Sequence, residues 1–332
     1  MTGSGPETDP GTGPEIRPGA GPGAAAAGGP DLSVVLIVRH PGEDPGAVLA
    51  ALAAEPGAEG VETILVEGRP GAGEEPGGTP PEDGAPPGLV RLVRPGLNMP
   101  RLKAEGAATA RGGAIAFLEP KGVPAPGWLA AARAALAARP GAALGGPVTA
   151  APGGGAADGA AYLFEYAAFA PGRLAAEGLR DLPGNNMILP AAALRSLCGD
   201  ILEAQGLNKP FCQARLVAGG VPLSLAPGLE VRLHSRHRLG ALLASRFRYA
   251  RCFGGTRAAL APRRRLWAYR LGAPAIPALL LARHLRAMGR ADGRASRPRG
   301  VLPALAALCL AWSAGEALGS WAGAGRSCEA LY

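Results

Sequence analysis

The chain has 332 residues, including 52 Gly and 34 Pro, and a net charge of +8. This length allows one large domain or two small ones, each with a buried core. The five cysteines lie far apart, without a Cys-x-x-Cys pair or a histidine at ligand spacing. We therefore expect no structural zinc site and no disulfide framework, and a reducing cytosolic compartment.

The first 30 residues are rich in Gly, Pro and Ala and contain no apolar run of the kind found in signal peptides. We expect this segment to be disordered. Leu32 to Val38 then forms a β-branched apolar run, which predicts the first strand. The sequence that follows predicts further strands at 61–66, 89–93, 114–118 and 144–148, and helices at 45–55, 100–111 and 128–138. A loop rich in Gly, Pro and acidic residues is expected at 69–87.

The alternation of strands and helices predicts an α/β fold with a mostly parallel sheet flanked by helices. Ligands of such sheets bind beyond the carboxyl ends of the strands. Three of the predicted strands end at polar side chains, namely Arg39, Glu67, and the pair Glu119 and Lys121. These residues are the first candidates for a binding site.

The sequence from 160 to 235 indicates shorter helices and strands. Asn185 and Asn186 follow a Pro-Gly turn and precede an apolar run. A helix is expected at 210–218 and two short strands within 221–235.

Almost all of the basic character lies in the last third, because residues 232–299 hold 17 Arg and a single acid, Asp292. Few aromatic residues are interleaved there and apolar runs follow directly, so we expect an anionic membrane surface as the partner and no nucleic acid. The cluster Arg246, Arg248 and Arg251 is expected to face lipid headgroups or a phosphorylated lipid acceptor.

Two apolar segments, 266–282 and 301–322, flank an Arg-rich loop. The second is long enough to cross a bilayer. If both crossed, the Arg-rich loop would lie opposite the α/β domain, against the positive-inside tendency. An in-plane or re-entrant first segment avoids this conflict. The alternative is that both are buried helices of a soluble domain.

Several stretches together resemble the family 2 glycosyltransferases of the GT-A fold. They are "SVVLIVRH", "VETILVEG", "GAATARGGAIAFLEP", "LPGNNMILPAAAL" and "ARLVAGGVPLSLAPGLEVRLHS". The resemblance covers roughly residues 32–235, and the tail is similar to that of some membrane-associated bacterial members. It implies a GT-A domain at 31–235, an Arg-rich membrane-proximal region at 236–300 and an apolar helix with a short tail at 301–332.

The resemblance also implies roles for the residues at the strand ends. Glu67 would bind the nucleotide base, with Arg39 near the nucleotide. Family members usually end the fourth strand with Asp-x-Asp, which holds Mg²⁺ or Mn²⁺ against the donor diphosphate. Here Glu119 and Lys121 occupy that place, so Lys121 would neutralise the diphosphate without a metal. The alternative is that metal binding and catalysis have both been lost.

The remaining site residues are also implied by the resemblance. The usual acceptor base falls near Asn208 and Lys209, neither of which is a carboxylate, so Glu203 and Asp200 are the candidates to replace it. Other candidates contact the diphosphate, the sugar or the acceptor, and they are His234, Asn185, Asn186 and Trp128. For Trp128 the alternative is packing of its helix on the sheet.

The sequence thus predicts a glycosyltransferase on the cytoplasmic face of the cell membrane. It would move a sugar from a nucleotide-diphosphate donor to a hydroxyl of a membrane lipid or lipid-linked acceptor. The alternative is a catalytically inactive relative that acts as a binding or scaffold partner.

Overall fold

A computed structural model describes residues 30–39, 42–68, 85–171, 179, 181–289 and 299–329 of the chain. The predicted disorder before Pro30 and most of the predicted loop at 69–87 lie outside these residues.

A seven-stranded sheet forms the centre of the molecule, in the order β3-β2-β1-β4-β8-β6-β9. Its first four strands are parallel, and β8 runs antiparallel to both of its neighbours. The bounds of the strands are β1 Leu32–Val38, β2 Glu62–Glu67, β3 Val90–Val93, β4 Ala114–Leu118, β6 Ala143–Gly145, β8 Asn186–Pro190 and β9 Leu223–Leu225. The predicted α/β fold with a mostly parallel sheet is confirmed. β1 and β4 are buried along their whole length, as expected for strands covered on both faces.

A second sheet of three short strands adjoins the first, in the order β5-β10-β7. Its strands are β5 Gly122–Pro124, β7 Val148–Ala150 and β10 Val231–Leu233. The predicted single strand at 144–148 is therefore wrong, because the chain forms β6 and β7 in different sheets. The chain passes between them at Gly146, where a Cβ would lie only 1.8 Å from the carbonyl oxygen of Leu229. Only glycine permits this close approach.

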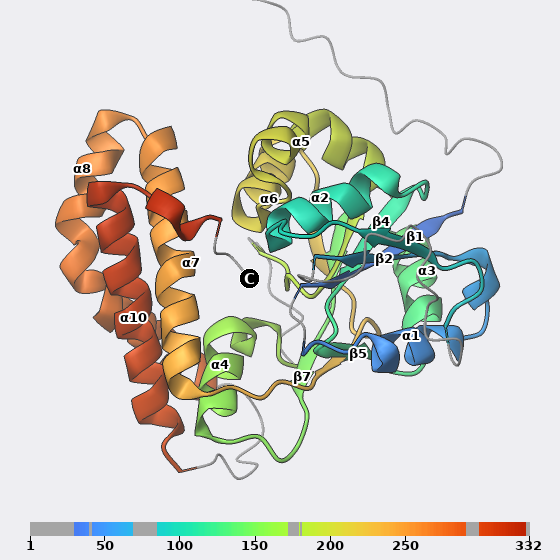
Figure 1. Ribbon diagram of the computed structural model, residues 1–332, viewed down its shortest axis with the longest axis horizontal. Coiled ribbons are helices and arrows are strands. Elements are labelled where there is room, and N and C mark those ends of the chain that lie inside the picture. Colours follow the sequence, from blue (N-terminus) through green and yellow to red (C-terminus); the bar gives the residue numbers. More distant parts are fainter. Residues whose placement is uncertain are drawn as a thin grey trace, which may run out of the picture.

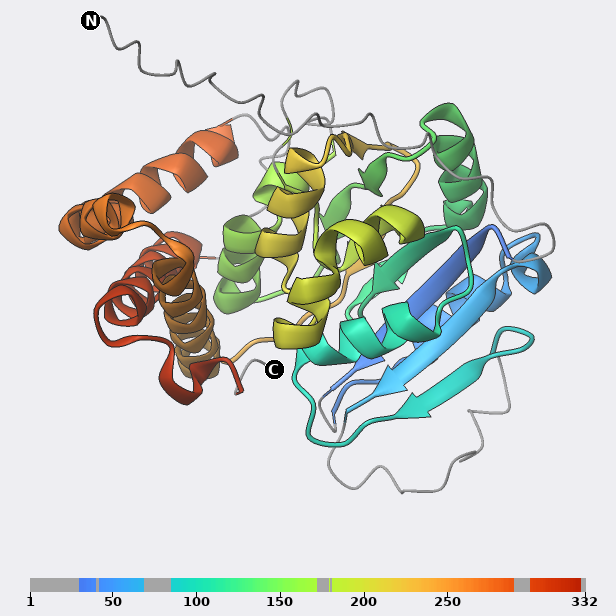
Figure 2. The ribbon, with the colours of Figure 1, turned by 90° about the horizontal axis from the view of Figure 1, so that it is seen from above.

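Helices cover both faces of the central sheet (Figures 1 and 2). One group comprises α2 Met99–Thr109, α5 Ala191–Gln205 and α6 Lys209–Ala218, and the other α1 Gly46–Ala53 and α3 Trp128–Ala138. The Asn98 side chain caps α2 by accepting a hydrogen bond from the Arg101 amide. Gly106 lets α2 approach the sheet, since a Cβ there would lie 2.2 Å from Val35.

The C-terminal helices form a separate layer beside the sheet domain (Figure 1). They are α7 Leu239–Leu260, α8 Arg263–Gly272, α9 Ile276–Gly289 and α10 Val301–Ala322, and they pack with α4 Ala156–Glu165. α7 and α10 contact each other through their backbones, because a Cβ on Gly315 would lie 2.2 Å from the Phe247 carbonyl oxygen. A second apolar core, including Leu163, Leu242 and Leu305, fills the space between α4, α7 and α10.

α10 is the single helix of the described residues that is long and apolar enough to cross a membrane. It has 22 residues, and its most apolar stretch of 18 residues has a mean hydropathy of 1.6 and is 44% buried inside the protein. Core helices of soluble proteins have the same properties, so membrane crossing by α10 stays a prediction.

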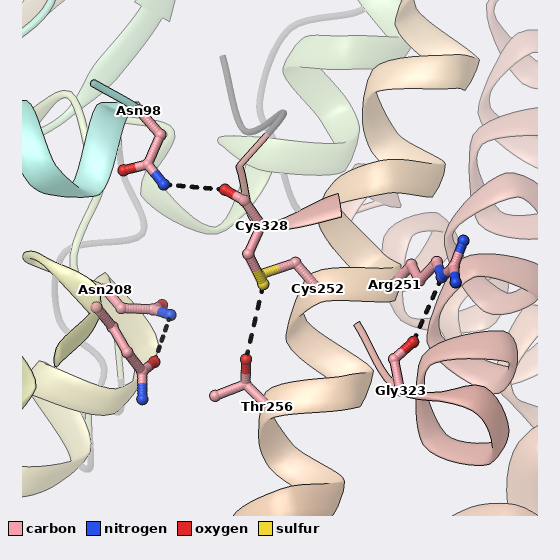
Figure 3. Close-up of a disulfide and its surroundings, with 8 residues drawn as sticks. Asn98, Asn208, Arg251, Cys252, Thr256, Gly323 and Cys328 are labelled. Atoms are coloured by element: carbon pink, nitrogen blue, oxygen red, sulfur yellow. Dashed lines mark hydrogen bonds between the residues drawn. A yellow bond between two sulfur atoms is a disulfide. The ribbon is translucent and has the colours of Figure 1, made fainter. Parts of the chain in front are cut away.

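A disulfide joins Cys252 of α7 to Cys328, just beyond the C-terminal end of α10 (Figure 3). The sequence predicts no disulfide framework, whereas the described residues contain this one disulfide. The two cysteines are 76 positions apart in sequence, yet their Cα atoms lie 4.9 Å apart. The parallel packing of α7 and α10 brings them together, and sequence spacing gives no sign of it. The other cysteines, Cys198, Cys212 and Cys309, are buried and free.

Candidate functional site

The polar strand ends lie along one edge of the central sheet. β1 pairs in parallel with both β2 and β4, with Val38 opposite Glu67 and Leu36 opposite Leu118. Arg39, Glu67 and Glu119 therefore leave the sheet at the same edge, as the sequence predicts for a ligand site.

Glu119 lies between two lysines. Its Oε2 atom is 3.1 Å from Nζ of Lys121, and its Oε1 atom accepts a hydrogen bond of 3.0 Å from Nζ of Lys103. Lys121 comes from the tight turn between β4 and β5, whereas Lys103 projects from the buried side of α2. The Lys103 ammonium also donates to the carbonyl oxygen of Gly184, at 2.9 Å. We refer to Glu119, Lys103 and Lys121 as the lysine–glutamate triad.

The triad has one positive charge in excess. Burial opposes ionisation of Glu119, but the ammonium groups of Lys121 and Lys103 lower the pKa of its carboxyl to about 2. Burial likewise opposes the charge on Lys121, but the Glu119 carboxylate raises the pKa of Lys121 well above its usual value. Both groups are therefore charged at neutral pH. The Lys121 side chain remains 30% exposed, so part of it can be reached from the sheet edge.

The triad does not fit a divalent metal ion. Mg²⁺ and Mn²⁺ prefer several oxygen ligands, of which carboxylates are the strongest. Glu119 is the single carboxylate at this strand end, and both of its oxygens already contact lysines. No group of three potential ligands lies together in the described residues. A divalent metal at this position is therefore disfavoured by the chemistry of the residues present.

His234 lies directly beside the triad. Its backbone amide donates a hydrogen bond of 2.6 Å to the carbonyl oxygen of Lys121, and its side chain is exposed. The buried phenol of Tyr166 lies near Lys121, and burial raises the pKa of Tyr166 far above its usual value. Lys121 thus lies near an uncharged phenol, and its backbone is held by the amide of His234.

Glu67 and Arg39 lie at the ends of β2 and β1 on the same edge, and both already have partners. The buried Glu67 carboxylate pairs with the Arg91 guanidinium of β3. The Arg39 side chain donates to the Leu97 carbonyl at 3.3 Å, and burial lowers the pKa of Arg39. Arg91 was not identified from the sequence, because its pairing depends on the register of β2 and β3.

The side-chain amides of Asn185 and Asn186 differ in their hydrogen bonding. The Asn186 amide accepts from Nε1 of Trp128 at 3.2 Å and donates to the Leu229 carbonyl at 2.5 Å. Both Asn186 and Trp128 are fully buried, so the structure gives them a packing role instead of the predicted contact with sugar or acceptor. Asn185 is also buried, but neither atom of its amide has a hydrogen-bond partner among the described residues. The Asn185 amide lies close to Gly122, because a Cβ on Gly122 would be 3.1 Å from Nδ2 of Asn185.

Asp200 and Glu203 lie on the surface of α5. The Asp200 carboxylate pairs with the Arg215 guanidinium at 3.2 Å, and the Glu203 side chain is exposed. The structure shows no contact between either residue and the triad within the described part of the chain. Their catalytic role stays a prediction.

Sequence reasoning also missed the carboxylate of Asp181, which lies three positions before the Gly184 turn. Asp181 accepts a hydrogen bond of 2.6 Å from Nζ of Lys209, which also donates to the Leu182 carbonyl. Asp181 and Leu182 precede the turn at Gly184, whose carbonyl oxygen accepts a hydrogen bond from Lys103. Asp181 follows no strand and belongs to no motif, so the sequence gives no signal for it. Lys103 was missed because a lysine within a helix is normally solvated.

Two of the three arginines expected at lipid headgroups bind within the protein. Arg246 is buried and pairs with Glu165 of α4 at 2.8 Å. Arg251 donates to the carbonyl oxygen of Gly323, at 3.4 Å (Figure 3). The prediction is therefore wrong for the buried Arg246, whereas Arg251 is half-buried and Arg248 is exposed.

No protein-family model matches the chain, and no curated protein matches its sequence. The structure is similar to mannosyltransferase PcManGT from Pyrobaculum calidifontis in complex with GDP-Man and Mn²⁺. That match has 16% identity and a TM-score of 0.45, and it covers 90% of this chain and 76% of the other. It is also similar to S. aureus TarS 1-349 in complex with UDP-GlcNAc, with 11% identity, a TM-score of 0.44 and coverage of 86% and 90%. These similarities are too distant to assign an activity, so a function has to be argued from the site itself.

Proposed function

We propose that this chain is a GT-A type glycosyltransferase that uses a nucleotide-diphosphate sugar and holds the donor without a metal ion. The observation that carries the proposal is the lysine–glutamate triad at the carboxyl end of β4. A diphosphate is strongly anionic, and the triad offers it an excess positive charge with a partly exposed lysine. The resemblance of the sequence to family 2 glycosyltransferases supports the same interpretation.

The reaction consists of attack by an acceptor hydroxyl on the anomeric carbon of the sugar. The bond between that carbon and the diphosphate oxygen breaks, the nucleoside diphosphate leaves with the electron pair, and a carboxylate takes the hydroxyl proton. Lys121 stabilises the negative charge that develops on the diphosphate. Glu119 and Lys103 hold Lys121 in place, so that little reorganisation is needed during the reaction.

Three carboxylates are candidates for the base that takes the proton. Asp200 and Glu203 lie close in sequence to Asn208 and Lys209, where the family pattern places the base, whereas Asp181 accepts a hydrogen bond from Lys209 itself. Asp181 is our preferred candidate. Replacing each carboxylate by its amide, Asp181→Asn, Asp200→Asn and Glu203→Gln, separates them, since loss of the base lowers kcat by about 100-fold or more.

We further propose that the acceptor is a membrane lipid or a lipid-linked molecule, and that the protein acts at an anionic membrane surface. Ten arginines and no acidic residue occur in α7, α8 and α9. This charge supports attraction to anionic lipids.

The first test is calorimetric titration of the full chain with UDP, GDP and dTDP, in chelator and then with Mg²⁺ or Mn²⁺. We expect binding in chelator that is lost in Lys121→Ala and retained in Arg139→Ala, which removes an exposed cation at the end of α3. Binding that requires the metal would contradict the metal-free site. Absence of binding to every nucleotide would overturn the transferase proposal.

A non-catalytic scaffold is the second candidate. The specific observation in its favour is that both Glu119 and Glu67 are already paired with cations of the protein. Release of free sugar from a bound donor, measured by chromatography, distinguishes the two. A scaffold would bind nucleotide and leave the donor intact, even at high protein concentration.

A further inference from the structure

The exposed apolar side chains of this protein are concentrated on the C-terminal helices. Eleven large apolar residues of the described chain are exposed, and all but Val217 lie between positions 239 and 321. Scattered single residues of this kind are normal on a protein surface, whereas a concentration on one unit indicates a contact surface.

The best-defined part of this surface is formed by α8 and α10. Leu310, Leu318 and Trp321 are spaced along one side of α10, opposite the glycines that contact α7. Trp267 and Leu271 of α8 continue the surface, because the Trp267 ring meets the Trp321 ring edge to face at 6.0 Å. We refer to these five residues as the outer face.

The outer face is bordered by positive charge. The Arg270 guanidinium stacks over both Trp267 and Trp321, at 5.5 and 4.6 Å from the ring centroids. Arg263, Arg264 and Arg265 are exposed at the start of α8, and Arg264 falls on the same side of that helix as Trp267 and Leu271. Apolar side chains, tryptophans and arginines without acids are the combination that binds at the interface of an anionic bilayer.

The packing of α10 argues against a crossing of the bilayer by this helix. Its buried side contacts α7 along most of its length and α4 of the sheet domain. Its single charged residue, Glu316, pairs with Arg257 of α7 at 2.5 Å. If α10 crossed the membrane in this arrangement, α7 would enter the hydrocarbon with its arginines, which is costly.

We propose that the outer face binds the surface of an anionic lipid bilayer in plane, as a peripheral anchor. This inference rests on the membrane association proposed above and specifies its partner, orientation and residues. It is independent of the donor chemistry of the triad.

Flotation of the full chain with lipid vesicles tests this proposal. We expect the protein to float with vesicles of phosphatidylcholine and phosphatidylglycerol and to remain at the bottom of the gradient with vesicles of pure phosphatidylcholine. Replacing Arg263, Arg264 and Arg265 together by Gln should weaken binding by more than about tenfold. Failure to bind anionic vesicles, or equal binding to both, would overturn the proposal.

Two leucines suit the apolar part of the test, because Leu271 is 74% and Leu310 is 60% exposed and neither supports the core. Leu271→Ser with Leu310→Ser should reduce flotation. The control is Val217→Ser, which changes an exposed residue of α6 and should leave flotation unchanged. If the two leucine substitutions change nothing, or if light scattering shows that they dissociate a dimer, the outer face does not bind lipid.

Extraction of cell membranes with alkaline carbonate separates peripheral binding from crossing. Release of the protein supports the in-plane anchor, and retention in the membrane overturns it. Nucleotide titration of the same preparations keeps the two proposals apart. If the protein binds nucleotide but not vesicles, the anchor is overturned and the transferase proposal stands. If it floats with vesicles but binds no nucleotide, the transferase proposal is overturned and the anchor stands.

Discussion

At the residue scale, the main electrostatic feature is a carboxylate that compensates two lysines. Glu119 is 13% exposed and Lys103 7%, so solvent screens their interaction only weakly. Removing one member of a buried ion pair leaves the other charge uncompensated. The triad is therefore a stability element as well as a candidate donor site.

Glu119→Gln should lower the free energy of unfolding by about 3 kcal/mol at neutral pH, because both lysines lose their counter-charge. The folded-state pKa of Glu119, about 2, lies below its ordinary value of 4.5. Its contribution is therefore fully present above about pH 4.5 and is lost as the pH falls toward 2. Denaturant unfolding of the wild type and the variant as a function of pH should show a difference in the free energy of unfolding that disappears between about pH 4.5 and pH 2. A difference in the free energy of unfolding that stays constant down to pH 2 would show that ionised Glu119 does not provide this stabilisation.

Asn186→Ala should cost about 2 kcal/mol of stability, because it leaves Nε1 of Trp128 and the Leu229 carbonyl without partners in the core. Nucleotide affinity should not change, since the side chain is fully buried. Chemical denaturation and calorimetric titration of the same variant check both statements. A loss of affinity without a loss of stability would restore the sugar contact that the sequence predicts.

At the element scale, the strands and helices of the sheet domain follow from the sequence because their patterns are local. The apolar runs of β1 and β4 and the helical spacing of α3 predict these elements with their observed bounds. The pairing of Arg91 with Glu67 and of Lys103 with Glu119 depends on register and helix orientation, which a single sequence does not specify. Glu119 and Lys121 were therefore predictable from the sequence, whereas the third member of the triad, Lys103, required the packed structure.

The contact between α7 and α10 depends on glycines, and Gly319 is the most informative position. A Cβ there would lie 2.3 Å from the Arg251 carbonyl and 2.7 Å from the Gly255 nitrogen, both backbone atoms. Gly319→Ala should therefore destabilise the helical layer by about 2 kcal/mol.

Gly199→Ala is the matched control for this prediction. Gly199 lies within α5 and has open space at the Cβ position, so the same substitution should raise the free energy of unfolding by up to about 1 kcal/mol. Thermal unfolding of both variants measures the difference. Equal effects at the two positions would show that α7 and α10 do not touch at Gly319.

At the scale of the whole molecule, a few specific contacts connect the helical layer to the sheet domain. Arg246 of α7 pairs with Glu165 of α4, and the Asn98 side chain at the start of α2 donates to the Cys328 carbonyl at 2.9 Å (Figure 3). The second contact involves a residue of the disulfide. The covalent bond thus holds the end of the chain where it meets the edge of the sheet domain that carries the candidate site.

Opening the disulfide should loosen the helical layer and leave the sheet domain folded. The bond spans 76 positions, and a loop of this length stabilises by about 4 kcal/mol through the entropy of the unfolded chain. The double variant Cys252→Ser with Cys328→Ser should therefore unfold its C-terminal helices at lower denaturant than the wild type, and a dithiol reductant should shift the wild type to the same midpoint. Trp267, Trp312 and Trp321 report on these helices by fluorescence. Nucleotide affinity should be retained, because the triad lies within the sheet domain. If reductant leaves the wild-type midpoint unchanged, the two cysteines are not joined in the folded protein.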